Sequence, residues 1–265
     1  MKRAIDVLGS AAGLLFLWPV ILPFVLLVWL QDGHFPFYVA PRVGKGKRPF
    51  MMVKLRSMTV DAHKLGWDST KADDPRVTRI GSVIRRYKLD EVPQLWNVLK
   101  GDMSLVGPRP NVQRETDLYT PFEVRLLEVR PGVTDFSSIV FTDLAEILKG
   151  QEDPNLAYRE IVRPWKSRLG VFYVERRSAA VDLHLIWLTA VGVISWRRAH
   201  RGVQRLLRRL GASRDLIEVA GREIGEGAWL PGTTTGGAER EGGGASPSDS
   251  TGGLVRRVDE RGVRD

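Results

Sequence analysis

The chain has 265 residues, of which 43% are hydrophobic and 27% charged, which is enough for one folded domain of about 200 residues with appendages. It contains no cysteine, which excludes disulfides, thiolate metal sites and cysteine nucleophiles. A net charge of +9 indicates polyanionic partners, and nucleic acid, anionic lipid headgroups and phosphorylated substrates all qualify.

The first predicted element is an apolar segment at residues 7–30, which holds 24 residues without a charge and is long enough to meet a bilayer. A secretory signal is disfavoured, because Asp6 interrupts its basic start, the apolar run is too long and no cleavage site of small residues follows. Two alternatives remain, a helix that spans the bilayer and a helix that enters and leaves by one face.

Pro19 and Pro23 lie in the middle of this segment and predict a kink or break between Trp18 and Pro23, because proline lacks an N–H and clashes with the preceding turn. Each half would then cover only about 16–18 Å at ~1.5 Å per residue, short of a ~30 Å hydrocarbon core. Basic residues flank both ends: Lys2 and Arg3 before the segment, and Arg42, Lys45, Lys47 and Arg48 after it. Because Lys and Arg prefer the cytoplasmic side, the pattern favours a re-entrant helix, with a kinked spanning helix as the alternative.

The next elements are predicted to be a loop, a strand, a polar stretch and two helices. They cover residues 34–49 (loop), 50–58 (strand), 59–75 (short helix and loop), 76–87 (basic helix) and 93–101 (helix). Pro93 suits the first turn of the second helix and Gly101 suits its end. A short extended run at 104–106 precedes a Gly-Pro-Arg-Pro turn.

Further helices are predicted around residues 115–130, 143–149, 156–177 and 181–210. The last is apolar on one side and basic at its end. With Trp187, Trp196, Arg197 and Arg198 it is typical of an amphipathic interfacial helix on anionic lipid. Residues 231–253 hold no large apolar side chain and predict a disordered tail.

These elements predict an α+β fold that is mostly helical, with a re-entrant membrane helix, a compact cytosolic catalytic domain and amphipathic interfacial helices. The predicted parts are an anchor (1–33), a catalytic domain (34–198), a basic amphipathic extension (199–230) and the tail (231–265).

Asp90 and Glu91 are adjacent carboxylates immediately before the helix that starts at Pro93, near the positive end of its dipole. That position favours an ionised carboxylate, which can act as a nucleophile or bind Mg²⁺ while its neighbour handles a proton. The plainer alternative makes both residues simple helix caps.

A basic frame surrounds this pair in the sequence. Its members are Lys54, Arg56, Arg76, Arg79, Arg85, Arg86 and Arg109. A diphosphate substrate needs such a frame, whereas surface charge or lipid contact is expected for about half of these residues. Gly107, Pro108 and Pro110 would hold Arg109 on a stiff turn, which favours a binding role for it.

Over residues 2 to about 198 the chain resembles the bacterial sugar transferases, the monotopic polyprenyl-phosphate phosphoglycosyl transferases, in their small form. The resemblance rests on the strings KRAIDVLGS, RVGKGKRPFMMVKLRSM, DDPRVTRIGSVIRR, LDEVPQLWNVLKGDMSLVGPRP, RPGVT and VERRSAAVDLHLI.

The resemblance implies a two-step covalent mechanism on the inner membrane, at its cytoplasmic face. Asp90 would attack the sugar-bearing phosphate of a UDP-sugar and release UMP, and undecaprenyl phosphate, deprotonated with help from Glu91, would take the phosphosugar. Mg²⁺ is implied as cofactor, with Asp90 as its ligand. The implied substrate-binding residues are Lys54, Arg56, Arg76, Arg85, Arg109, Pro108 and Pro110, and the implied membrane-anchor residues are Lys2, Arg3, Trp18, Pro19 and Pro23.

Two departures from the family pattern are visible. The family's helix break is usually Ser-Pro, whereas Trp18 precedes Pro19 here, so a hydroxyl that supports the bend is missing. The family commonly has Gly after RPGVT, where this chain has Asp135, in a region that can shape the choice of sugar.

Rival functions explain less of the sequence. A nucleic-acid partner is not expected, because it leaves the apolar segment and the carboxylate pair unused. A non-catalytic membrane scaffold related to the family is the main alternative, and loss of Asp90, Glu91 or Arg109 would have favoured it. The scattered histidines do not support a zinc site. The sugar, the glycan pathway and homodimer formation are not determined by the sequence.

Overall fold

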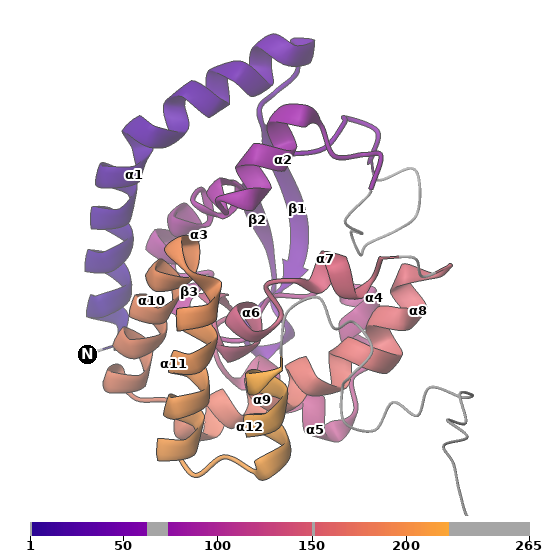
Figure 1. The fold of residues 1–265 in the computed structure, drawn as a ribbon. Coiled ribbons are helices and arrows are strands. Elements are labelled where there is room, and N and C mark those ends of the chain that lie inside the picture. Colours follow the sequence, from indigo (N-terminus) through magenta and orange to yellow (C-terminus); the bar gives the residue numbers. More distant parts are fainter. Residues whose placement is uncertain (1, 63–73, 150–151, 223–265) are drawn as a thin grey trace, which may run out of the picture. The chain divides into compact units, whose positions relative to one another are not determined.

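The computed structural model describes residues 2–62, 74–149 and 152–222, all of which belong to one compact unit, Met1–Thr233. Within these residues the fold is mostly helical and carries two small two-stranded sheets (Figure 1). Most of the stretch predicted as a short helix and loop at 59–75, and the whole predicted tail at 231–265, lie outside the described residues.

Helix α1, Lys2–Asp32, contains both prolines and bends midway along its length, as the sequence predicts (Figure 1). By length and composition alone, it is the one helix of the described part that could cross a membrane. Its first turns pack closely on the unit, since a Cβ at Gly9 would lie 2.7 Å from Leu105 and one at Gly13 would lie 2.8 Å from Leu95. Beyond these turns one face is exposed and apolar, as in Phe16 and Leu30, while Ile21 and Val28 on the opposite face are buried.

Both ends of α1 are bound to the same unit. At its start the Lys2 ammonium donates to Asp182 at 2.6 Å, and the Arg3 guanidinium donates to the carbonyls of Val98 and Leu99. At its end Asp32 accepts two hydrogen bonds of 2.6 Å from Arg56. Lys2 and Arg3, the basic residues predicted before the membrane segment, are therefore also bound to the protein.

A hairpin of β1 (Phe37–Val43) and β2 (Pro49–Leu55) follows, with Phe37 opposite Leu55 and Val43 opposite Pro49. The strand predicted at 50–58 is confirmed, but the prediction of a loop at 34–49 is wrong. Pro41 lies within this first strand, and proline is usually a sign of a loop. Proline is tolerated in a two-stranded sheet, where an edge needs no N–H donor.

The central elements lead to the carboxylate pair. They are α2 (Arg79–Arg86), the 3₁₀ turn η3 (Leu89–Glu91), α3 (Gln94–Lys100) and β3 (Ser104–Val106). Thr78 caps α2 by accepting from the Gly81 N–H at 2.9 Å, and Gly101 ends α3 with a φ of 94°. Strand β3 pairs in parallel with β4, Gly132–Thr134, which the sequence did not predict.

The C-terminal half is a set of helices around the main core. Its first elements are α4 (Gln113–Thr116), α5 (Pro121–Val124), η4 (Arg125–Glu128), α6 (Phe136–Val140) and α7 (Leu144–Ile147). Its later elements are α8 (Pro154–Ala157), the π-helical turn η5 (Tyr158–Val162), α9 (Arg163–Arg176), α10 (Ala179–Ile194), α11 (Trp196–Arg209) and α12 (Arg214–Gly221).

Two predicted helices are divided in the structure. The helix predicted at 115–130 is three short elements, because Thr120 and Pro121 start a new capped helix. The helix predicted at 181–210 breaks at Ser195, whose backbone is extended, and α11 folds back to pack on α10.

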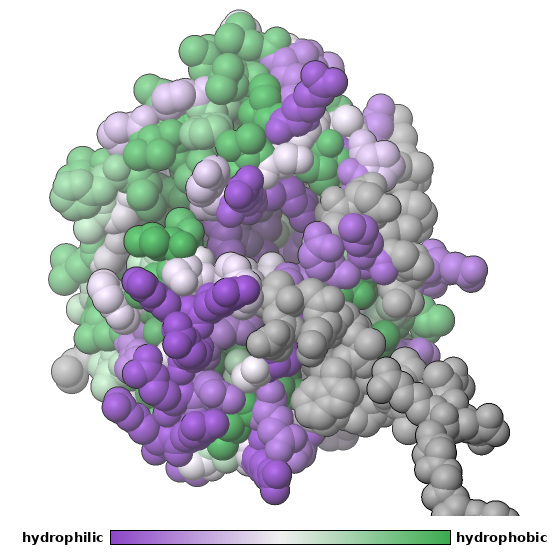
Figure 2. Space-filling model, in the orientation of Figure 1, coloured by the Kyte–Doolittle hydropathy of each residue, from purple (hydrophilic) through white to green (hydrophobic). Residues whose placement is uncertain are grey.

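The main core lies between these helices and includes Phe136, Leu169, Tyr173, Leu185 and Leu207. The boundary predicted at residue 198 falls inside α11, and both α11 and α12 contribute to this core. Figure 2 shows apolar residues gathered along the side of α1, and a hydrophilic hollow between α2 and α11.

Candidate functional site

Asp90 and Glu91 lie on the 3₁₀ turn η3, immediately before α3, where both carboxylates are largely shielded from solvent. The turn begins at Lys88, whose φ of 55° is in the left-handed region. This tight turn places both neighbouring side chains beside Lys54, and Glu91 has Arg109 as a second partner. The predicted pair thus exists as one half-buried acidic group.

Lys54 lies between the two carboxylates. Its ammonium is 3.5 Å from Asp90 Oδ2 and 3.5 Å from Glu91 Oε1. Asn97 of α3 fixes β2 beside η3, because its side chain donates to the Met51 carbonyl and accepts from the Val53 N–H. The end of β2 therefore places the Lys54 ammonium beside both carboxylates, in line with the basic frame that the sequence predicts around this pair.

Arg109 is the second basic partner and donates to Glu91 Oε1. It lies on the turn after β3, where Pro108 and Pro110 are buried beneath it. Gly107 and Gly132 approach each other so closely that a side chain at either would clash with backbone. The Gly-Pro-Arg-Pro turn is therefore a rigid support that its prolines shape. The arginine of this turn reaches the carboxylate pair of Asp90 and Glu91, the dyad.

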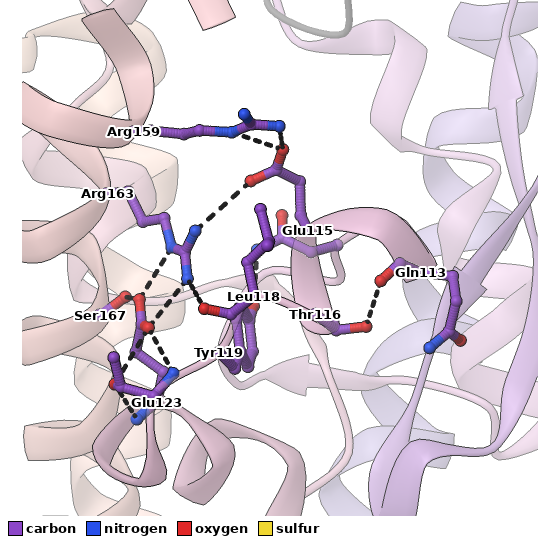
Figure 3. A network of polar contacts seen from close by, with 11 residues as sticks. Gln113, Glu115, Thr116, Leu118, Tyr119, Glu123, Arg159, Arg163 and Ser167 are labelled. Atoms are coloured by element: carbon purple, nitrogen blue, oxygen red, sulfur yellow. Dashed lines mark hydrogen bonds and ion pairs between the residues drawn. The ribbon is translucent and has the colours of Figure 1, made fainter. Parts of the chain in front are cut away.

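A polar network holds the segment that follows Arg109 (Figure 3). Arg163 of α9 binds Glu123 at 2.9 Å and lies over the ring of Tyr119, 5.3 Å from its centre. The Tyr119 hydroxyl accepts from Asn111 at 2.6 Å, and the Asn111 carbonyl in turn accepts from Val43 of β1. This chain of contacts connects α9 with the hairpin through the end of the Arg109 turn.

The two carboxyl groups have opposite protonation tendencies. Burial raises the pKa of Asp90, an effect that Glu91 adds to and that Lys54 opposes. Burial would also raise the pKa of Glu91, but Arg109 and Lys54 outweigh it and hold that pKa well below its usual range. Glu91 in turn raises the pKa of Arg109. Environments that separate the pKa values of a pair are typical of catalytic carboxyls with different roles.

Of the other predicted binding residues, the structure brings Arg85 near the dyad, where its charge lowers the pKa of Asp90. Arg56 and Arg76 serve elsewhere. Arg56 is buried against Asp32 at the end of α1, and Arg76 forms a buried ion pair with Asp74 at 2.6 Å. Both act as cross-links in this structure.

Two lysines near the site were not predicted. Lys88 is two residues before Asp90 in the sequence, and burial lowers the pKa of Lys88 against the opposing charge of Glu91. Lys166 of α9 lies over the rings of Tyr158 and Phe141, and burial with the nearby charge of Arg109 lowers its pKa to about 8. Position next to the acidic pair could have indicated Lys88, whereas no sequence signal connects Lys166 to the site.

Asp135, which departs from the family pattern, is a helix cap. Its carboxylate accepts from the Ser138 N–H at 2.7 Å at the start of α6, and from the hydroxyls of Ser137 and Ser138. The side chain is buried, so its polar atoms are used within its own turn.

The acidic pair fits a magnesium ion that is shared with a substrate. No group of three His, Cys, Asp or Glu side chains among the described residues is placed to hold a metal by itself. Mg²⁺ is commonly held by one or two carboxylates together with substrate phosphates and water. The ion pair of Asp90 joins its Oδ2 atom to the Lys54 ammonium, so the Oδ1 atom offers a ligand oxygen to the metal.

Comparison with known proteins gives consistent matches. A family model described as bacterial sugar transferase matches residues 1–196. The exopolysaccharide production protein ExoY of Rhizobium meliloti is 34% identical over 208 residues, which cover 72% of this chain and 84% of that protein.

Two further relatives carry substrate names. The UDP-glucose:undecaprenyl-phosphate glucose-1-phosphate transferase of Xanthomonas campestris is 34% identical over 75% of this chain and 40% of its own length. The UDP-N-acetylgalactosamine-undecaprenyl-phosphate N-acetylgalactosaminephosphotransferase of Aeromonas hydrophila is 38% identical over 53% of this chain and 34% of its own length. The chain therefore spans well under half the length of these two relatives.

Proposed function

The chain belongs to the bacterial sugar transferase family, and on that premise we propose that it transfers a sugar 1-phosphate from a UDP-sugar to undecaprenyl phosphate. The names of the Xanthomonas and Aeromonas relatives supply the donor and acceptor classes. The observation that carries the proposal is the half-buried Asp90–Glu91 pair, in which Lys54 lies beside both carboxylates and Arg109 donates to Glu91 alone. The name of the ExoY relative supports a place in surface-glycan assembly, such as exopolysaccharide, capsule or O-antigen.

Asp90 is the proposed nucleophile. Its raised pKa makes its ionised carboxylate the more basic of the two, and Lys54 favours the ionised form. The carboxylate oxygen forms a bond to the sugar-bearing phosphorus, the bond from that phosphorus to the UMP oxygen breaks, and UMP leaves with the electron pair. A phosphate oxygen of undecaprenyl phosphate then attacks the same phosphorus, and the bond to Asp90 breaks to restore the carboxylate.

Glu91 is better suited to positioning than to proton transfer. A carboxylate whose pKa lies well below its usual range is a weak base. Its hydrogen bond from Arg109 fixes the guanidinium beside the nucleophile. There Arg109, Lys54 and Arg85 supply positive charge to the phosphate oxygens as the transition state forms.

Magnesium fits this arrangement with Asp90 as its protein ligand, and when bound it would neutralise charge on the diphosphate.

We also propose that α1 is re-entrant and holds the site at the cytoplasmic face of the inner membrane. Lys2 and Arg3 at its start and Asp32 at its end bind one and the same unit. A straight spanning helix would carry its two ends about 45 Å apart at ~1.5 Å per residue, on opposite sides of the bilayer. The bend and the shared attachment favour entry and exit by one face.

The test is a reaction without acceptor. Enzyme mixed with UDP-sugar and Mg²⁺ should release about one UMP per site and gain the mass of one phosphosugar at Asp90. Asp90→Asn keeps the shape of the side chain but should abolish both signals. A wild-type enzyme that releases no UMP until undecaprenyl phosphate is added, with no added mass, would instead support direct transfer in a ternary complex.

The same experiment addresses the non-catalytic alternative. A scaffold would release no UMP with or without undecaprenyl phosphate, across a panel of UDP-sugars. The panel also identifies the sugar.

A further inference from the structure

A groove between α10 and α11 lies apart from the dyad. Its volume is about 500 Å³. The lining residues are Trp187, Leu188, Val191, Arg198, Arg201, Gln204 and Arg205. None of them belongs to the catalytic site described above, and α11 lies almost wholly beyond residue 196, where the family match ends. The groove is therefore a feature of this chain that the proposed transfer does not use.

One wall of the groove is cationic. Helix α11 holds six arginines and no acidic residue. Arg198, Arg201 and Arg205 are spaced by three and four residues, so they share one face of the helix, and all three are exposed. In the described part of the chain, none of these three arginines forms an ion pair with a carboxylate. These guanidinium groups are available to an external anion.

The other wall is apolar and comes from α10. Trp187 is 66% exposed although it lines the groove, and Leu188 and Val191 lie beside it. The same helix exposes Leu183, and Ile194 at its end is 87% exposed. In Figure 2 hydrophilic residues gather over α11, and apolar residues lie next to them on the side of α1.

The cationic and apolar walls together select the kind of ligand. A phosphate with attached hydrocarbon satisfies both, because arginine binds phosphate oxygens through paired N–H groups and the apolar wall covers acyl carbon. A second copy of this chain would bring two sets of arginines together. Nucleic acid would leave the apolar side chains of Trp187 and Val191 against a charged sugar-phosphate backbone.

The start of α10 is also bound to the start of the membrane helix, since Asp182 accepts from Lys2 of α1 at 2.6 Å. The groove is thus carried by a helix that is fixed to the membrane segment. We infer that the groove between α10 and α11 binds the headgroup of an anionic phospholipid of the bilayer. Arg198, Arg201 and Arg205 hold the phosphate, and Trp187 and Val191 contact the first acyl carbons.

The test counts lipids on the full chain. Protein in a neutral detergent is mixed with phosphatidylglycerol, phosphatidylcholine or undecaprenyl phosphate, and native mass spectrometry measures the retained molecules. The groove variant is R201E/R205E. The matched control is R208E/R209E, which makes the same charge change at exposed arginines of the same helix that do not line the groove. Thermal melting of each variant verifies its fold.

Wild-type protein should retain one phosphatidylglycerol in preference to phosphatidylcholine. Retention should fall at least tenfold in R201E/R205E and stay within about twofold in R208E/R209E. Trp187→Ala should weaken retention by loss of the apolar contact, without any change of charge. Undecaprenyl phosphate binding and UMP release should be the same in R201E/R205E as in the wild type, so this result is separate from the proposed transferase activity.

Four results would overturn the inference. Equal loss in both double variants would mean that only the total surface charge matters. Equal retention of phosphatidylcholine would remove the anionic preference. Loss of undecaprenyl phosphate binding in R201E/R205E would make the groove an acceptor site, and displacement of the lipid by an oligonucleotide would make it a nucleic-acid site.

Discussion

Asp90 and Glu91 are neighbours in the chain, yet their surroundings differ. Burial raises the pKa of Asp90, and the charges of Lys54 and Arg85 oppose this effect without a direct hydrogen bond. Glu91 instead accepts a direct hydrogen bond from Arg109, which lowers its pKa. A difference of this kind assigns the chemistry to one carboxylate and the alignment of an arginine to the other.

The pH dependence of covalent labelling should reflect the raised pKa of Asp90. Attack requires the ionised carboxylate, so labelling should fall as the pH drops through a value above the 3.8 of an ordinary aspartate. Glu91 stays ionised across the same range. Single-turnover labelling, measured by intact mass over a series of pH values, gives the pH at which labelling is half lost. A midpoint at or below pH 3.8 would contradict the raised pKa of Asp90 as the nucleophile.

Glu91→Gln separates positioning from base catalysis. We expect labelling and turnover to fall by about 10²-fold, because the amide no longer fixes Arg109. The acid limb of the pH profile should move to lower pH, because the charge of Glu91 no longer raises the pKa of Asp90. Arg109→Lys should give a loss of similar size, since lysine lacks the planar fork. Arg130→Lys, at an exposed arginine outside the site, is the control. Loss of one limb of the turnover profile in Glu91→Gln would identify Glu91 as a base instead.

Lys166 gives a stability prediction at the residue scale. Its pKa falls from 10.5 to about 8 on folding, so at pH 7 the folded protein carries a charge in an unfavourable place. The penalty is complete below pH 8 and disappears between pH 8 and 10.5, where the folded state releases its proton first. Lys166→Met should therefore raise the free energy of unfolding by about 1–2 kcal/mol at pH 7, allowing for partial exposure of the side chain. Thermal melting should show a smaller gain at pH 10, and an equal gain at both values would contradict the burial argument.

At the scale of elements, helix α1 combines a membrane surface with protein contacts. Gly9 and Gly13 let its first turns approach β3 and α3, and the prolines lie within a helix whose apolar residues are exposed on both sides of the bend, as in Phe16 and Leu30. Short polar contacts at both ends then fix the helix to the unit.

The bend should decide the topology of α1. Replacement of Pro19 and Pro23 together by Leu should straighten the helix, so that it begins to span the bilayer. Cysteines introduced at positions 3 and 46 report the sides of the membrane through an impermeant thiol reagent. Both should react from the cytoplasm in the parent protein, and labelling on two sides should increase in the double leucine variant. Two-sided labelling of the parent would mean that α1 spans.

The attachment of α1 at its start should depend on Asp182. Its carboxylate accepts from Lys2 at 2.6 Å and from Tyr173 at 2.7 Å, and it is buried. Asp182→Asn should lower the free energy of unfolding by about 2 kcal/mol, because it leaves a partly buried ammonium without its counter-ion. Hydrogen exchange should rise in the first turns of α1. Glu218→Gln, which breaks the exposed pair with Arg214, is the control and should change stability by less than about 0.5 kcal/mol.

At the scale of the whole molecule, the packed core extends beyond the family match. That match ends at residue 196, whereas Ala199, Val203, Leu207 and Val219 are buried in the main core. The described part of the predicted basic extension therefore has a structural role as well as a charged surface.

Two truncations should differ for this reason. Removal of residues 231–265 should leave transfer activity nearly unchanged, because most of that segment lacks apolar residues to join a core. Removal of everything after 195 should destabilise the catalytic unit severely, since it uncovers buried side chains of α10 and α6. Melting temperature and UMP release of both truncated proteins measure the difference. A stable, active protein ending at 195 would contradict the packing argument.

The sequence by itself determined the features that depend on local chemistry. Prolines predicted the bend in α1, Pro93 and Gly101 bounded α3, and the acidic pair within a basic frame indicated the site. Tertiary structure decided which of the basic residues reach that site. Arg56 and Arg76 belong to the same predicted basic frame as Arg109, but each of these two is bound to a nearby aspartate.

Tertiary structure also placed Lys166, divided the helix at Ser195 and paired β3 with β4. Each depends on contacts between segments far apart in the chain, such as Phe136 with Phe172 or α11 with α6, and the free energy of those contacts exceeds local propensity. Local sequence carries the charge and the turn chemistry of this protein, while burial against distant segments selects which charges meet.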